Sequence, residues 1–112
     1  MALIWAAWNN GQHNRSGAGY GLKVPIQDRD RLFDKEWQSV VLELPARDGF
    51  SQVKLNVEKP SFWSDACHEL ISVEIGRWLL TNGYAPWPKQ QPPKLKIEHL
   101  GGPKFRVQGV AN

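Results

Sequence analysis

The polar, glycine-rich stretch 8–21 is the part of this sequence whose residue types could do chemistry. Its four glycines allow main-chain N–H groups to approach a ligand closely, and its asparagine, histidine, arginine and serine side chains add hydrogen-bond donors and acceptors. We expect a binding loop with Trp8 and the distant Trp87 as an aromatic platform beside it. The candidate ligand contacts are Asn10, His13, Asn14, Arg15, Ser16, Gly17 and Gly19.

The spacing of these glycines matches neither the dinucleotide-binding fingerprint nor the phosphate-binding loop that ends in Gly-Lys-Ser/Thr. Successive N–H groups could still form an anion-binding nest, with help from Arg15 and the Ser16 hydroxyl. The competing interpretation is that the glycines only permit tight turns while Tyr20 packs on the core. In the same way, Trp87 could fold back over the end of a helix instead of joining a platform.

His13 is the best candidate for proton transfer, because an imidazole on a polar loop titrates near neutrality. Cys67 and His68 are adjacent and would point about 100° apart on a helix, so they make a poor nucleophile–base pair. We expect Cys67 to be a small buried hydrophobe. Three scattered histidines and one cysteine have no metal-ligand spacing, so the sequence predicts neither a metal nor another cofactor.

The formal net charge of +3 is unevenly distributed, since residues 84–112 hold five Lys or Arg against one Glu. Such a basic segment attracts nucleic acid or an acidic protein surface. Strand alternation predicts that two opposed strands present four cations on one face, opposite Leu95, Ile97, Phe105 and Val107. These candidate polyanion-binding residues are Lys94, Lys96, Lys104 and Arg106. The alternative is that they protect a sheet edge from pairing with other chains.

A chain of 112 residues with 41% hydrophobic residues is enough for one core, so we expect a single compact domain over 1–112. No apolar run reaches the roughly 18 residues that a membrane helix needs, and the first residues lack the pattern of a secretory signal. With a single cysteine, these features predict a cytoplasmic protein with no membrane partner.

Hydrophobic periodicity and turn residues predict the elements that must position these side chains. We expect strands at 2–8 and 20–24, a charged helical turn at 28–35 held to the core by Leu32 and Phe33, and two hairpins. The first hairpin joins 37–44 to 50–58, with Val53, Leu55 and Val57 inward, and the second joins 94–100 to 104–107.

One long helix is expected over 65–82, with Ser64 as N-cap and Gly83 as the C-terminal stop. Its stripe of Cys67, Ile71, Ile75, Trp78 and Leu79 would face the sheet. Leu70, Val73 and Leu80 would lie on the opposite side, as an interface covered by N-terminal residues or by a second copy in a homodimer.

The predicted fold class is α+β, a five- or six-stranded mostly antiparallel sheet with this helix packed across one face. The leading functional hypothesis is a non-enzymatic binding module for an anionic partner, with nucleic acid favoured over an acidic protein, that uses the 9–21 loop and the basic C-terminal hairpin. One alternative is a small hydrolase or nuclease that uses His13. Another is an inhibitor or adaptor of a second protein, of the kind that mobile elements encode, acting through the helix face.

Overall fold

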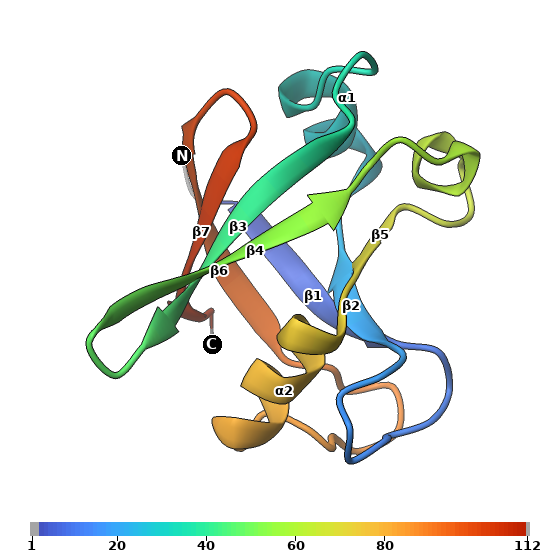
Figure 1. The fold of residues 1–112 in the computed structure, drawn as a ribbon. Coiled ribbons are helices and arrows are strands. Elements are labelled where there is room, and N and C mark those ends of the chain that lie inside the picture. Colours follow the sequence, from blue (N-terminus) through green and yellow to red (C-terminus); the bar gives the residue numbers. More distant parts are fainter. Residues whose placement is uncertain (1–2, 112) are drawn as a thin grey trace.

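The structure is a computed structural model and describes residues 3–111. Seven strands form one sheet that curls into a nearly closed barrel, in the order β4-β3-β7-β6-β1-β2-β5 (Figure 1). The strands are β1 Leu3–Asn9, β2 Tyr20–Lys23, β3 Ser39–Ala46, β4 Gly49–Asn56, β5 Glu69–Ile71, β6 Lys94–Gly101 and β7 Lys104–Val110. The helices are α1 Ile26–Leu32, the 3₁₀ turn η1 Pro60–Trp63 and α2 Val73–Thr81.

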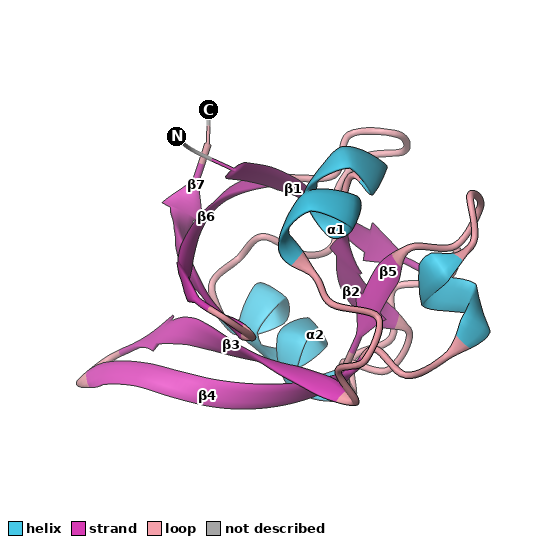
Figure 2. Cartoon of the chain, turned by 90° about the horizontal axis from the view of Figure 1, so that it is seen from above, coloured by secondary structure: helices cyan, strands magenta, loops and turns pink. Residues whose placement is uncertain are grey.

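The two α-helices lie at opposite ends of the barrel, α1 at the top of Figure 1 and α2 at the bottom. Figure 2 looks along the barrel and shows the strands forming its wall. Within residues 3–111, neither helix has the length and apolar character that crossing a bilayer requires.

The strands expected from alternation and turn residues are confirmed as elements. β1 and β2 occupy the two short predicted strands, and β3–β4 and β6–β7 are the two predicted hairpins. The predicted inward residues are buried in both hairpins, because alternate side chains of a strand share one face. They are Val53, Leu55 and Val57 in the first, and Leu95, Ile97, Phe105 and Val107 in the second.

The predicted fold class is wrong, because the sheet is seven-stranded, mixed and nearly closed rather than a flat five- or six-stranded antiparallel sheet under one long helix. β3 pairs in parallel with β7 through Val41–Lys104 and Glu43–Arg106. This pairing joins the two hairpins, and no local pattern in the sequence specifies it. Closure also leaves no single open face on which a long helix could lie.

The predicted helix over 65–82 is wrong in its first half. α2 begins after Ser72, whose side chain accepts a hydrogen bond from the Glu74 N–H. Ser64 does accept hydrogen bonds from the N–H groups of Ala66 and Cys67, but these close only a turn. The chain then extends as β5 and pairs with β2. Ser64 therefore forms the hydrogen bonds of a helix cap, although a strand follows it and no helix does.

This correction moves several residues that were expected on one helix. Cys67 is exposed and is not a buried hydrophobe, and Ile71 is 46% exposed on β5. Leu70 is buried in β5, so the helix face expected for Leu70, Val73 and Leu80 does not exist. Trp78 is only partly buried.

The core fills the barrel and is built around aromatic rings. Phe33, directly after α1, stacks on Phe105 of β7 at 4.9 Å between ring centroids. It also packs against Phe62 of η1 at 5.2 Å, and Trp5 of β1 packs against Phe105 at 5.3 Å. Phe33 therefore anchors α1 to the core, as predicted for the charged segment.

Candidate functional site

The glycine-rich loop between β1 and β2 is packed tightly against α2. Gly17 has a φ of +90°, and a Cβ there would lie 2.7 Å from the Val73 carbonyl oxygen. A Cβ on Gly76 would lie only 2.0 Å from the Gly17 carbonyl oxygen. The Arg77 Nε also donates to the Ser16 carbonyl at 3.2 Å. Close backbone packing therefore accounts for Gly17 and Gly76 without a ligand.

Hydrogen bonds within the loop use most of its polar side chains. The Asn14 amide donates to the Ala18 carbonyl at 3.0 Å, and the Ser16 hydroxyl accepts from the Ala18 N–H at 3.2 Å. Asn10 accepts from the Gln12 N–H at 3.3 Å, and its side chain lies where a Cβ on Gly19 would clash. Arg15 differs from these residues, because it is exposed and forms no ion pair within residues 3–111.

His13 holds the loop to the barrel through both ring nitrogens. The Asn9 Oδ1 accepts from the Gly11 N–H, so the Asn9 Nδ2 faces His13 and donates to its Nε2 at 3.0 Å. The His13 Nδ1 then carries the proton and donates to the Tyr20 hydroxyl at 2.7 Å. Burial raises the pKa of Tyr20. This arrangement gives His13 a structural function and leaves neither nitrogen free for proton transfer.

The two tryptophans expected to form a platform have different surroundings. Trp87 packs edge-on against His13 at 4.7 Å and against Tyr20 at 5.7 Å between ring centroids. Trp8 is partly buried on the opposite face of β1 from the core and enters no aromatic ring pair within residues 3–111. Trp87 thus covers His13 and Tyr20, whereas the alternative drawn from the sequence places it over the end of a helix.

The four cations of the C-terminal hairpin lie on the outer face of the barrel but not in one cluster. Lys96 lies opposite Gly109, whereas Lys104 lies opposite Gly101 beside the turn. Lys94, opposite Ala6, is therefore nearest the 10–19 loop and Lys104 is at the other end of the hairpin, whereas Lys96 and Arg106, which lies opposite Glu98, stand between them. Strands β6 and β7 are both interior, so these residues protect no free sheet edge.

Arg106 is already bound within the protein. Its Nε and one terminal nitrogen donate to the Glu43 Oε1 at 2.8 and 2.7 Å, and its guanidinium lies 4.0 Å from the centre of the Phe50 ring. Hydrogen bonds from Gln52 and Arg106 hold the pKa of Glu43 below its ordinary value. Of the four predicted polyanion contacts, Arg106 is therefore the least available to bind a partner.

A cavity of about 580 Å³ lies between the tip of the β3–β4 hairpin and α2. The indole N–H of Trp78 donates to the Pro45 carbonyl at 2.8 Å and ties the hairpin to the helix. We call this cavity the arginine cleft, because Arg47 and Arg77 both line it. Its other lining residues are Pro45, Ala46, Ser51, Trp78, Thr81 and Asn82.

The sequence analysis did not identify the arginine cleft. Arg47 stands in a hairpin turn and Arg77 on a helix beside Glu74, so each reads as an ordinary surface charge. The sequence did contain the hydrogen-bond donors that line the cleft, on Arg47, Ser51, Thr81 and Asn82. No carboxylate is among the lining residues. Only the register of the hairpin against α2 brings them together.

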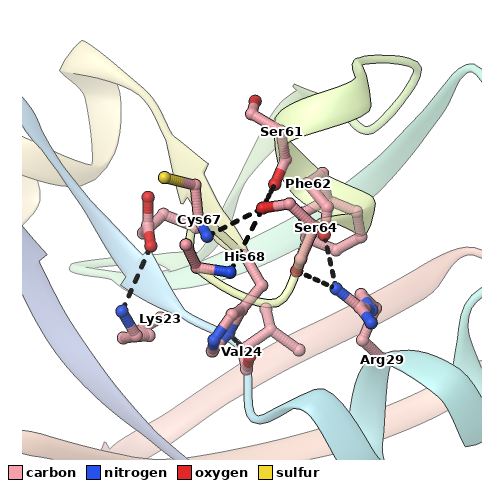
Figure 3. Close-up of polar contacts among 10 residues, drawn as sticks. Lys23, Val24, Arg29, Ser61, Phe62, Ser64, Cys67 and His68 are labelled. Atoms are coloured by element: carbon pink, nitrogen blue, oxygen red, sulfur yellow. Dashed lines mark hydrogen bonds and ion pairs between the residues drawn. The ribbon is translucent and has the colours of Figure 1, made fainter.

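A buried polar cluster on the far side of the barrel has a structural explanation (Figure 3). Arg29 of α1 is buried and donates from one terminal nitrogen to the carbonyls of Phe62 and Ser64, at 2.9 and 2.7 Å. The ring of His68 donates from Nδ1 to the Val24 carbonyl, and Val24 returns its N–H to the His68 carbonyl at 3.0 Å. These bonds hold the 59–68 segment against α1 and β2.

Within the described residues, the histidines, the cysteine and the carboxylates are not brought together as metal ligands. No group of three His, Cys, Asp or Glu side chains within 3–111 is placed to hold a metal ion. Comparisons with models of known protein families, with curated proteins and with solved structures find no match for this chain.

Proposed function

We propose that this protein is a binding module for an anionic partner, a nucleic acid, which it binds at the arginine cleft. The observation that carries the proposal is that two exposed arginines line one cavity of about 580 Å³, with no carboxylate among its lining residues. This site replaces the composite of loop and C-terminal hairpin, because Arg106 is bound by Glu43 and Lys94 and Lys104 lie at opposite ends of the hairpin.

The charges of the cleft are available to a partner. Arg47 and Arg77 are exposed, and neither takes part in an ion pair within residues 3–111. The hydrogen bond from the Arg77 Nε to Ser16 fixes that side chain while leaving its terminal nitrogens free. Arg15 directly precedes Ser16, so it extends the same cationic surface along the loop.

The chemistry of the cleft favours phosphate groups. A guanidinium presents a planar fork of donors that matches two phosphate oxygens, and hydroxyl and amide groups such as those of Ser51 and Asn82 add single contacts. The net charge of +3 would add long-range attraction to a polyanion. An acidic protein surface could also bind these arginines, but its carboxylates do not have the regular spacing of a phosphate backbone.

The test measures binding of fluorescent single- and double-stranded oligonucleotides at several salt concentrations, for the native protein, Arg47→Gln and Arg77→Gln. Each lost phosphate contact should reduce the slope of log K against log salt by about 0.7–0.9. Arg47→Gln is the cleaner variant, because Arg77 also anchors the loop through Ser16.

Arg31→Gln is the matched control, since Arg31 is an exposed arginine on α1 at the other end of the barrel. An equal reduction of slope in Arg31→Gln and Arg47→Gln would mean diffuse attraction and no binding at the cleft. Absence of binding at protein concentrations of about 100 μM, where non-specific DNA binders associate, would exclude nucleic acid and favour an acidic protein partner.

A further inference from the structure

A second cavity, of about 310 Å³, opens on the outer wall of the barrel, away from the arginine cleft. Its lining comes from four parts of the chain: Ile4 and Ala6 of β1, Lys94 of β6, Lys23 and Pro25 at the end of β2, and His68 before β5. We call it the lysine pocket. Its volume is at the lower limit of small-molecule sites, which begin near 300 Å³.

The strand register explains why the wall is hollow at this point. Ala6 lies directly opposite Lys23 on one neighbouring strand and opposite Lys94 on the other. Residues opposite one another in antiparallel strands share a face, so the smallest side chain of the row stands between the two longest. Ile4 and Pro25 add apolar walls on either side, which leaves a floor without charge.

The charges around the lysine pocket leave one positive charge uncompensated. Lys23 is 3.3 Å from the buried Glu69 carboxylate, which neutralises it. Lys94 is exposed and forms no ion pair within residues 3–111. An apolar floor beside one unpaired ammonium group would suit a small ligand that has an apolar part and a single negative charge.

His68 supplies an independent polar contact in the same pocket. The side chain is 8% exposed, and its Nδ1 donates to the Val24 carbonyl, as Figure 3 shows. The other ring nitrogen, Nε2, has no hydrogen-bond partner in the part of the chain that the structure describes. With the proton on Nδ1, Nε2 is an acceptor, so it would meet a donor group of a ligand in the cavity and not a carboxylate.

We propose that the lysine pocket binds a small organic carboxylate, with the apolar part of the ligand over Ala6 and its carboxylate at Lys94. The site is separate from the arginine cleft and does not depend on nucleic-acid binding. Benzoate is a suitable probe, because it has one ring and a single negative charge. A ligand with so few heavy atoms should have a Kd on the order of 1–10 mM.

The experiment is a titration of the folded protein with benzoate, followed by amide chemical shifts in NMR spectra. We expect shifts concentrated at Ala6, Lys23, His68 and Lys94, and weaker binding of the neutral analogue benzamide. Lys94→Gln should weaken benzoate binding about three- to tenfold, as expected for loss of a charge-assisted contact at the surface. Ala6→Leu should fill the hollow and abolish binding.

Lys96→Gln is the matched control, because Lys96 is on the same strand, lies opposite Ile4 and does not line the pocket. It should leave benzoate affinity unchanged. Benzamide binding as tightly as benzoate, equal losses in Lys94→Gln and Lys96→Gln, or no localised shifts at 50 mM, roughly five times the weakest expected Kd, would each overturn the proposal.

Discussion

At the scale of single residues, the function of a charged side chain in this protein depends on its partner more than on its type. Arg106 and Arg47 are both arginines on the outside of the barrel. Arg106 is bound by Glu43 and lies over Phe50, whereas Arg47 lines a cleft and forms no ion pair within residues 3–111. Residue type and spacing in the sequence predicted Arg106 as a binding residue, whereas our proposal from the folded structure uses Arg47.

Glu43 gives a prediction about acid stability. Its pKa is lowered in the folded protein by hydrogen bonds from Gln52 and Arg106, so its contribution to stability is complete above the ordinary pKa of 4.5. That contribution is lost as pH falls through the lowered folded value, because protonation breaks these bonds. The stability difference between the native protein and Glu43→Gln should therefore shrink as pH falls below 4.5.

The measurement is the midpoint of urea denaturation between pH about 7 and about 3, the range over which a carboxylate with a lowered pKa takes up its proton. Glu58→Gln is the control, because the Glu58 carboxylate is exposed and takes part in no ion pair or side-chain hydrogen bond within residues 3–111. A constant difference between the native protein and Glu43→Gln at every pH would contradict this assignment of the bonds.

Arg29 gives a prediction about the buried cluster. Replacement by Met keeps an unbranched apolar stem but removes the guanidinium, which leaves the carbonyls of Phe62 and Ser64 without their donor. Buried groups left unsatisfied cost about 1–3 kcal/mol each, so Arg29→Met should lower the free energy of unfolding by about 2–6 kcal/mol. Chemical denaturation measures it, with the exposed Arg31→Met expected within about 0.5 kcal/mol of the native protein.

At the scale of elements, the sequence predicted strands better than helices, for a physical reason. Each strand of the two hairpins pairs with a neighbour in sequence, so alternation and turn residues determine it locally. The stretch 65–71 has helical periodicity, and Ser64 forms cap-like hydrogen bonds. Its extended form is selected by pairing with β2, which is far away in the sequence. Such tertiary pairing overrides local propensity.

Gly76 of α2 gives a prediction at this scale. Replacing a helical glycine with alanine normally stabilises a helix by up to about 1 kcal/mol. Here the new Cβ would lie 2.0 Å from the Gly17 carbonyl oxygen, which is backbone and cannot turn aside. Gly76→Ala should therefore destabilise the protein by at least about 2 kcal/mol and separate the loop from α2.

Thr81→Ala is the control for Gly76→Ala, because Thr81 is exposed on the same helix and its change tests helix propensity alone. The measurements are the free energy of unfolding and the NMR shift of the Ser16 and Arg77 amides. A more stable Gly76→Ala protein would show that the loop does not pack on α2 as described.

At the scale of the whole molecule, the parallel pairing of β3 with β7 is what turns two hairpins and three further strands into a barrel. It joins residues 41–43 to residues 104–106. No sequence pattern in either strand predicts this pairing. The candidate binding sites follow from the same long-range arrangement. The arginine cleft needs the first hairpin to lie over α2, and the lysine pocket needs β1 between β2 and β6.

The ends of the sheet give the last prediction. β4 and β5 are the two terminal strands, and they approach one another without a hydrogen-bonded ladder in the described residues. Every second amide of β4 points away from β3 and has no strand to pair with. We expect these amides to exchange with solvent much faster than those of β1 and β6, each of which has a strand on both sides.

Hydrogen exchange followed by NMR at two protein concentrations tests this gradient and also whether two copies pair through β4. A monomer with an open seam gives alternating protection along β4 at both concentrations. Protection that becomes continuous only at the higher concentration would show that β4 pairs with a second copy, because an exposed strand edge is a template for another chain. Continuous protection at both concentrations would contradict the open seam, since it would require β4 and β5 to be hydrogen-bonded within one barrel.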